Sequence, residues 1–330
     1  MSRILLLATG GTIASVPSGN GLRPETDGAG LLSRLGAAAG RYEVTSVDLM
    51  KLDSSDLQPE DWQALAREIF SRRESFDGVV VTHGTDTMAY TASMLSFMLP
   101  SIGLPVVLTG SQLPMGHPLT DAPANLRLAL EMAASGCPGV FVAFGNLVLR
   151  GCRAAKHSTE AFDGFRSVNL PPVAVADASG LRIAPALVRR PDGPARLEDR
   201  FESRVALVKL FPGLEPRLLA ALPGLGMRGA VVEAFGSGGV PTRIRNLTEA
   251  LKSLAKSGLV VAVGSQCPDG KADLSIYEAG QRVQNDGIVC LGEMSVESAV
   301  TKLMWALGQT ASRDEAAALF AEDLAGELIP

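Results

Sequence analysis

The sequence predicts an α/β protein, with a doubly wound parallel sheet in an N-terminal domain and a smaller α/β domain at the C-terminus. Two apolar runs, residues 4–7 and 79–81, are typical of strands buried on both faces of a parallel sheet. Each run opens into a loop that carries threonines, at residues 8–13 and 82–87. Ligands of open α/β sheets bind at the carboxyl ends of strands, so these loops are the first candidates for a functional site.

The first half of the chain alternates between strand-like and helix-like segments. Strands are predicted at residues 4–7, 44–50, 79–81 and 105–108, and helices at residues 59–73, at 88–99 and from about residue 121. The helix at 59–73 begins with a proline and has Glu60 and Asp61 in its first turn, as helix starts commonly do. This order favours a parallel sheet with right-handed crossovers.

A charged segment with prolines separates two sets of elements and is typical of a linker. We therefore expect an N-terminal catalytic domain at residues 1–189, a linker at 190–204 and a C-terminal domain at 205–330. Strands are predicted there at 205–210, 230–235, 259–263 and 288–291, and helices at 248–256 and 296–307. Residues 312–315 (SRDE) predict a capping box at the start of the last helix.

Composition and charge narrow the class of function. The 330 residues are 46% apolar, and 30 basic residues are dispersed among 35 acidic ones, which indicates no nucleic-acid surface. No run approaches the roughly 18 apolar residues of a membrane span, and the run at 4–7 is too short for a signal peptide. The four cysteines form no Cys-x-x-Cys pair, so neither a zinc site nor a disulfide framework is indicated. We expect a cytoplasmic protein with a small-molecule ligand.

Several common kinds of site find little support. The chain has no Gly-x-Ser-x-Gly motif and only three histidines, which leaves few candidates for a Ser-His-Asp hydrolase or a histidine metal site. His83 is interpreted as a buried structural donor rather than as a base. The glycine pattern at residues 224–229 follows a helical stretch and precedes a strand, so it predicts a turn and not a dinucleotide site.

Threonine and serine hydroxyls that follow the predicted strands remain as candidates for the chemistry. Thr12 follows two glycines that let the backbone approach a ligand, and amides of that loop could bind an oxyanion. Ser54 and Ser55 follow the predicted strand at 44–50, and Thr85 and Asp86 follow the strand at 79–81. Each loop taken alone could simply form a turn or cap the helix that follows it. Loops from successive strands converge at one edge of the sheet, however, which favours a site.

Lys156 is a further candidate with two open interpretations. It is either an ordinary surface lysine or a cation held by Asp86 that acts on the Thr85 hydroxyl.

Four stretches together resemble the bacterial-type L-asparaginases, and most closely their cytoplasmic type I branch. They are ATGGTIA at residues 8–14, DSSD at 53–56, THGTDTM at 82–88 and SVESAVTKL at 295–303. The resemblance covers nearly the whole chain. It implies hydrolysis of L-asparagine to L-aspartate and ammonia through an acyl-enzyme, with no metal or organic cofactor. It also implies a homotetramer built as a dimer of dimers, with active sites between protomers.

The resemblance also implies a role for each candidate residue. It implies that Thr12 is the nucleophile and that Thr85, Asp86 and Lys156 form a second set of catalytic residues. Substrate binding falls on Gly11, Ser54, Ser55, Thr85 and Asp86. Among these, the two serines would bind the α-carboxylate and Asp86 the α-ammonium.

The chain departs from the family pattern at two places. Many relatives carry a tyrosine in the loop after the first threonine, whereas residues 15–30 contain none and Leu22 stands at the expected position. We therefore expect Tyr277 to hydrogen-bond near Thr12 of the neighbouring protomer, with interface packing as the alternative. Some type I enzymes bind asparagine at an effector site through a threonine and an arginine. Here Ala155 and Glu233 stand at those places, so we expect weak or absent homotropic activation.

Two other functions use the same scaffold. One is a tRNA-dependent amidotransferase subunit that releases ammonia from an amide donor, and it normally carries an extra N-terminal segment. The other is an amino-acid sensor without activity, which should lack one of the four catalytic residues, yet all four are present. The preference for asparagine over glutamine stays open, because one methylene is worth only about 1–3 kcal/mol in a binding pocket.

Overall fold

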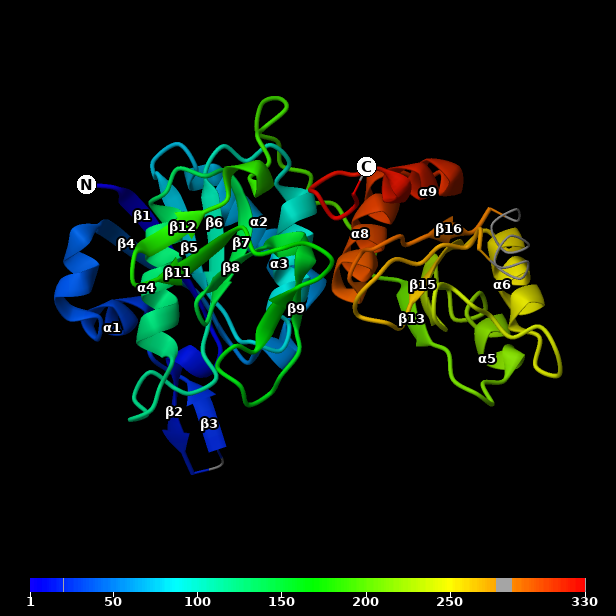
Figure 1. Cartoon of the computed structure of the whole chain (residues 1–330), viewed down its shortest axis with the longest axis horizontal. Helices are drawn as coiled ribbons and strands as arrows, with labels where there is room; N and C mark the ends of the chain where they lie inside the picture. Colours follow the sequence, from blue (N-terminus) through cyan, green and yellow to red (C-terminus); the bar gives the residue numbers. More distant parts are fainter. Residues whose placement is uncertain (20, 277–286, 330) are drawn as a thin grey trace. The chain divides into compact units, whose positions relative to one another are not determined.

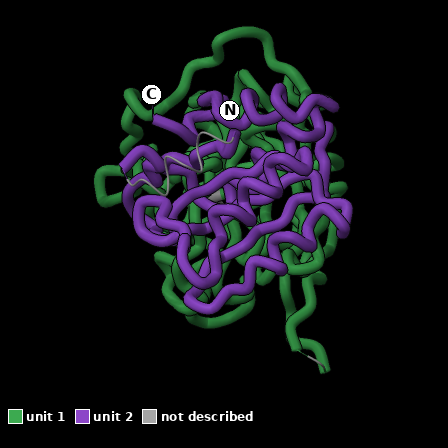
Figure 2. The backbone as a smooth tube through the Cα atoms, turned by 90° about the vertical axis from the view of Figure 1, so that its right-hand side faces the viewer, with its two compact units in different colours: residues 1–199 green, residues 200–330 purple. Residues whose placement is uncertain are grey.

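The computed structural model describes residues 1–19, 21–276 and 287–329 (Figure 1). The chain divides into two compact units, Met1–Asp199 and Arg200–Pro330, which Figure 2 distinguishes by colour. The division falls inside the segment 190–204.

Unit 1 is built around an eight-stranded sheet in the order β12-β11-β8-β7-β6-β5-β1-β4. The parallel part of the sheet contains β1 (Arg3–Gly10), β4 (Glu43–Leu52), β5 (Gly78–Thr82), β6 (Pro105–Thr109) and β7 (Gly139–Phe144). An antiparallel extension adds β8 (Leu147–Arg150), β11 (Ala174–Asp177) and β12 (Gly180–Ile183). Since β1 lies between β4 and β5, the loops that follow these three strands leave the sheet at the same edge.

Helices cover both faces of this sheet. On one face, α1 (Gly28–Ser33) and α4 (Ala122–Ala133) pack against alternate strand residues such as Ile4, Leu6 and Val80. The apolar residues between them on the strands point to the opposite face, where α3 (Met88–Met98) packs on β6 and β7, and α2 (Pro59–Arg72) packs on α3. Burial on both faces explains why the strands read as continuous apolar runs.

Short elements carry the loops at the sheet edge. The one-turn 3-10 helix η1 (Thr12–Ala14) follows β1 and leads into a hairpin of β2 (Ser15–Ser18) and β3 (Gly21–Pro24). A second 3-10 turn, η3 (Ser54–Asp56), follows β4. The remaining short elements of unit 1 are η2 (Gly36–Arg41), η4 (Gly151–Arg153), η5 (Pro185–Leu187) and the two-stranded sheet of β9 (Ala154–Lys156) and β10 (Phe165–Ser167).

Unit 2 is a smaller parallel sheet with helices on its faces. Its strands run in the order β13 (Val205–Lys209), β14 (Gly229–Ala234), β15 (Val260–Ser265) and β16 (Val289–Cys290). Helices α5 (Pro216–Ala220) and α6 (Leu247–Lys256) pack against each other, and α8 (Val296–Gln309) and α9 (Arg313–Ala321) pack against each other and the sheet. The predicted α/β fold class, with a larger and a smaller domain, is confirmed.

Most predicted elements are present with small shifts at their ends. The predicted helix at 59–73 is α2, and the predicted strand at 44–50 is the longer β4. The glycine pattern at 224–229 forms the connection between α5 and β14, as predicted. The capping box of α9 is only half formed. The Ser312 hydroxyl accepts from the Glu315 amide at 3.3 Å, but the Glu315 carboxylate bonds to the Thr310 hydroxyl instead of closing the box.

An ion pair is fully buried beneath α8 in unit 2. The Lys302 ammonium lies 2.5 Å from a Glu327 carboxylate oxygen, and neither side chain is exposed to solvent. Glu327 also accepts from the amides of Leu324 and Ala325, at 3.0 and 2.6 Å, and Lys302 donates to the Glu322 carbonyl. These bonds fasten the C-terminal segment to α8. None of the described helices is long and apolar enough to cross a membrane.

Candidate active site

The three loops at the carboxyl ends of β1, β4 and β5 touch one another through glycine backbone. Gly11 has a positive φ of 79°, and a methyl group added there would lie 2.3 Å from the Gly84 amide nitrogen. A methyl group added to Gly84 would lie 2.5 Å from the Ser54 hydroxyl oxygen. Because only glycine permits these approaches, the loops converge as predicted.

Thr12 is half-buried and is the first residue of η1. Gly11, the residue before it, donates its amide to the Leu52 carbonyl at 2.9 Å and makes no side-chain cap. That amide is therefore already used and is not one of the amides that the loop could offer to an oxyanion. The interpretation of Thr12 as a helix cap is wrong, because no side-chain cap is present.

Thr85, Asp86 and Lys156 form one hydrogen-bonded group. The Lys156 ammonium donates to the Thr85 hydroxyl at 2.8 Å and to Asp86 Oδ1 at 2.7 Å. Lys156 is only 17% exposed at the end of β9, whereas Asp86 is 63% exposed. The interpretation of Lys156 as an ordinary surface lysine is therefore wrong. Asp86 does not cap α3 either, because the capping position is Thr87 and no side chain caps it.

The serine loop after β4 is held in two ways. Ser54 is buried, and its carbonyl accepts from the Thr87 hydroxyl at 2.8 Å. Ser55 is exposed and donates its hydroxyl to Asp53 Oδ1 at 2.6 Å and its amide to the same oxygen at 2.9 Å. The hydroxyl bond and then the amide bond hold the pKa of the Asp53 carboxyl below its usual range. The structure thus ties Ser55 to Asp53 and brings Ser54 to Gly84.

The cap of the next helix lies elsewhere than this loop. At the start of α2, the Gln58 amide donates to Asp61 Oδ2 at 2.8 Å. The alternative that the serine loop merely caps α2 is therefore wrong.

His83 is buried beneath the second threonine loop. Its Nδ1 lies 2.7 Å from the Gly84 carbonyl oxygen, and its Nε2 lies 2.9 Å from the Thr91 hydroxyl. The Trp62 indole N–H donates to the same Thr91 hydroxyl at 2.9 Å. Burial lowers the pKa of His83 to about 4, so the imidazole is neutral at pH 7. The interpretation of His83 as a structural residue is confirmed, but its partners on α2 and α3 carry no sequence signal.

A polar cluster at the end of β6 was not anticipated. Asp121 accepts from the amides of Gln112 and Leu113 at 3.0 to 3.1 Å, and from the Asn125 side chain at 3.0 Å. The Gln112 side chain in turn donates to carbonyls of the loop that follows Lys156. In the sequence, Asp121 indicated only the start of a helix.

Leu22 and Tyr277 are the two positions considered above for a tyrosine hydroxyl near Thr12. Leu22 lies on β3 of the hairpin and is 57% exposed, so no aromatic hydroxyl stands there. Tyr277 lies outside the described residues.

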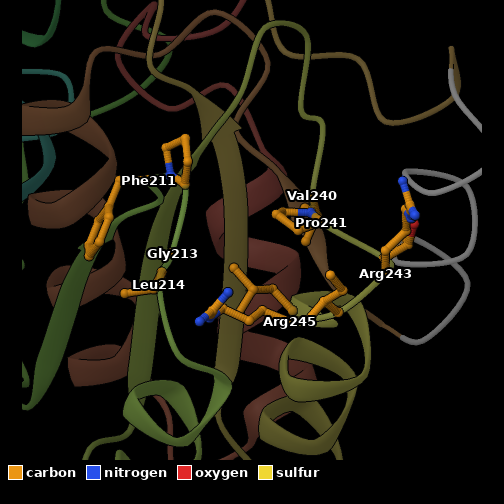
Figure 3. Close-up of a pocket in the computed structure, with 11 residues that line it drawn as sticks. Phe211, Gly213, Leu214, Val240, Pro241, Arg243 and Arg245 are labelled. Carbon is orange, nitrogen blue, oxygen red and sulfur yellow. The ribbon is translucent and has the colours of Figure 1, made fainter.

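A separate hollow of about 340 Å³ lies in unit 2, between the loops that follow β13 and β14 (Figure 3). Apolar side chains such as Phe211, Leu214 and Val240 line it, and Arg245 crosses it. The Arg245 guanidinium is paired with Glu215 at 2.6 Å. None of the described candidate site residues lines this hollow. Within the described part of the chain, no group of three or more His, Cys, Asp or Glu side chains is placed to hold a metal ion.

Comparison with known proteins identifies the family. Residues 3–189 match the model of the asparaginase N-terminal domain, and residues 204–320 match that of the glutaminase/asparaginase C-terminal domain. An L-asparaginase of Thermococcus kodakarensis is 38% identical over 329 residues, which cover 99% of each protein. A glutamyl-tRNA(Gln) amidotransferase subunit from Pyrococcus abyssi is 33% identical over all of this chain and 77% of that protein.

The solved structures agree with this result. The structure of the thermostable L-asparaginase from Thermococcus kodakarensis superposes with a TM-score of 0.93 at 36% identity, and covers 99% of both chains. With two family models spanning most of its length and relatives matched end to end, the chain belongs to the asparaginase family.

Proposed function

We propose that this protein is an amidohydrolase that converts L-asparagine and water to L-aspartate and ammonia. The observation that carries the proposal is the placement of the Lys156 ammonium on both Thr85 and Asp86, in a loop that touches the Thr12 loop. Membership of the asparaginase family supports it.

The reaction proceeds in two acyl-transfer steps. The Thr12 hydroxyl oxygen attacks the side-chain amide carbon, its proton passes to the amide nitrogen, and the C–N bond breaks to release ammonia. The resulting aspartyl ester of Thr12 is then attacked by water, which restores the Thr12 hydroxyl and releases L-aspartate. Splitting the hydrolysis in this way replaces one difficult step by two easier ones.

Lys156 directs the hydroxyl of Thr85. Because the ammonium has only donors, it occupies one lone pair of the Thr85 oxygen and leaves the hydroxyl hydrogen and the other lone pair for the reacting water or substrate. Asp86 holds the ammonium in place. Thr85, Lys156 and Asp86 thus act as the set that transfers protons in the two steps.

Substrate recognition uses the zwitterionic end of asparagine. Ser54 and Ser55 bind the α-carboxylate, and the Gly11 backbone lets the substrate approach closely. The exposed Asp86 carboxylate binds the α-ammonium. Ser55 would exchange its present bond to Asp53 for one to the substrate.

Tyr277 completes the site from a neighbouring protomer, in a cytoplasmic homotetramer built as a dimer of dimers. The absence of a tyrosine at Leu22 supports this role. Tyr277→Phe should lower kcat by at least about tenfold without changing the sedimentation profile of the assembly. Unchanged kcat would make Tyr277 a packing residue, and a monomer in sedimentation would remove the shared site.

The amidotransferase alternative is less well supported. The identity to the Pyrococcus abyssi amidotransferase is lower than that to the L-asparaginase, and the match covers less of that protein. The sensor alternative is disfavoured because Thr12, Thr85, Asp86 and Lys156 are all present and Lys156 donates hydrogen bonds to both Thr85 and Asp86.

The test is ammonia release from L-asparagine and from L-glutamine by the purified protein. Thr12→Ala and Thr85→Val should each abolish most of the turnover, while Thr45→Val on the exposed side of β4 should leave it unchanged. Mass spectrometry after rapid acid quenching should find an aspartyl group on the peptide that contains Thr12. Absence of ammonia release by the wild-type protein, or near-normal rates in the Thr12→Ala variant, would overturn the proposal.

A further inference from the structure

One ionisable group in the second threonine loop has no role in the reaction as described. His83 is only 1% exposed and precedes Gly84 and Thr85 directly. Both ring nitrogens have partners, so the position of its proton can be worked out from chemistry alone.

The Nδ1 atom of His83 carries the proton. A carbonyl oxygen can only accept a hydrogen bond, so the 2.7 Å contact with the Gly84 carbonyl requires a donor at Nδ1. At Nε2 the ring nitrogen is instead the acceptor. An indole N–H can only donate, so the Thr91 oxygen accepts from Trp62 and uses its own hydrogen for Nε2. The hydrogen bonds therefore run in one direction, from Trp62 through Thr91 and His83 to Gly84.

This series of hydrogen bonds ends at the Gly84–Thr85 peptide. The Gly84 carbonyl and the Thr85 amide belong to one planar trans peptide, in which C=O and N–H point in opposite directions. Fixing the carbonyl on the buried imidazole therefore turns the Thr85 N–H away from the interior. That amide has no acceptor among the described residues, so it is available to a ligand at the sheet edge.

The surrounding backbone leaves this peptide little room to move. The His83 amide donates to the Thr109 carbonyl at 2.8 Å. A methyl group added at Gly110 would lie 2.3 Å from the His83 carbonyl oxygen. Together with the contacts of Gly84 to Gly11 and Ser54, these approaches confine the peptide on several sides. The hydrogen bond from His83 Nδ1 to the Gly84 carbonyl fixes which way the plane of the Gly84–Thr85 peptide is turned.

We propose that His83 is a positioning residue for amide hydrolysis: as the neutral Nδ1–H tautomer, ordered by Thr91 and Trp62, it sets the Gly84–Thr85 peptide and thereby the placement of Thr85. The kinetic consequence rests on the proposed function, whereas the tautomer does not.

The tautomer is tested without reference to activity. Protein labelled with ¹⁵N at histidine is examined by solid-state NMR at pH 7, and the His83 signals are those that disappear in His83→Asn. A protonated Nδ1 and an unprotonated Nε2 are expected. A protonated Nε2, or a doubly protonated ring, would overturn the assignment.

The positioning role is tested by variants matched to each nitrogen. The side-chain amide of His83→Asn can place an N–H near the Nδ1 position, whereas His83→Leu has a similar volume and no donor. We expect His83→Asn to keep kcat within about threefold and His83→Leu to lower it by at least about tenfold, with little change in KM. Thr91→Val, which removes only the hydroxyl, should lower kcat several-fold and allow both tautomers in the NMR spectrum.

The possible outcomes separate the two claims. A wild-type protein that releases no ammonia contradicts the proposed function and leaves the tautomer to the NMR result. An active wild type with full kcat in both His83→Leu and Thr91→Val contradicts the positioning role. If His83→Leu does not fold, as judged by thermal unfolding, Thr91→Val alone decides the kinetic question.

Discussion

The backbone of Gly84 lies so close to Gly11 that no side chain fits between them: a methyl group on Gly11 would come within 2.3 Å of the Gly84 nitrogen. The two threonine loops are therefore joined through their main chains. The distance between Thr12 and the Thr85 group depends on this contact rather than on flexible side chains.

Gly11→Ala should therefore reduce both stability and activity. The added methyl group meets backbone atoms that cannot move aside, and the positive φ of Gly11 adds strain of about 1–2 kcal/mol. We expect a clear fall in the thermal unfolding temperature and a loss of at least about tenfold in kcat. Gly180→Ala is the control, because Gly180 has a positive φ of 98° with nothing within 4 Å. Equal effects of the two variants would show that strain alone matters.

Lys156→Met should lower kcat by about 10²–10⁴-fold, because it removes the ammonium but keeps most of the side-chain volume. Asp86→Asn should lower kcat and raise KM together, since Asp86 has contacts with Lys156 and, in the proposal, with substrate. Effects in the double variant should be far from additive because the two side chains act as a unit. Steady-state ammonia release measures all three. The exposed Lys256→Met serves as control, and additive losses would contradict coupling.

Stability should fall as the pH is lowered, because of His83. Burial lowers the pKa of its imidazole from 6.5 to about 4 in the folded protein. Between pH 6.5 and about pH 4 the unfolded chain binds a proton at His83 that the folded chain does not. The free energy of unfolding therefore decreases as the pH falls through this range. The full effect is about 3 kcal/mol and is complete below pH 4.

Urea unfolding at pH 7 and pH 4.5 isolates this contribution. The decrease between the two pH values should be smaller in His83→Asn than in the wild type, because asparagine does not titrate. Identical decreases would mean that His83 is protonated in the folded protein as readily as in the unfolded chain.

The buried pair in unit 2 should respond more strongly to single than to double substitution. Lys302→Met leaves the Glu327 carboxylate buried without its cation, which should cost about 3–5 kcal/mol in the free energy of unfolding. Lys302→Met combined with Glu327→Gln should recover part of that loss. Urea unfolding measures the cycle. Arg3→Met, which breaks the exposed pair with Asp77, should change stability by less than about 1 kcal/mol.

Activation of the enzyme by asparagine at a second site should be weak or absent. Glu233 stands where some type I enzymes carry an arginine, and its half-buried carboxylate would repel an effector carboxylate. The plot of initial rate against asparagine concentration should be hyperbolic. A Hill coefficient well above one would contradict this prediction.

Sequence patterns predicted the parallel strands well because β1, β5 and β6 are buried on both faces and read as unbroken apolar runs. The antiparallel strands β8, β11 and β12 have only four residues each, and most residues of β11 and β12 are at least partly exposed, so their pattern is weak. The same limit applies to the hairpin of β2 and β3, whose residues are mostly exposed.

For the site, the residue types at strand ends could be predicted, but not the contacts among them. Lys156 is 71 residues from Thr85 in the chain, and only the position of β9 brings the ammonium to the hydroxyl. The Ser55–Asp53 bond and the Trp62–Thr91–His83 chain depend on side-chain rotamers and on packing between α2 and α3. Neither has a periodic signal in sequence.

The position of β1 between β4 and β5 also constrains how this protein is made. β1 leaves the ribosome first, yet both of its neighbours end later in the chain, at Leu52 and Thr82. At about 5–20 residues per second, the first strand waits several seconds for its second partner. During that time its apolar residues and the edge that will pair with β5 are open to wrong pairing. Slowing translation once Thr82 has left the ribosome should therefore raise the yield of folded protein, whereas a pause once only Leu52 has left it should not.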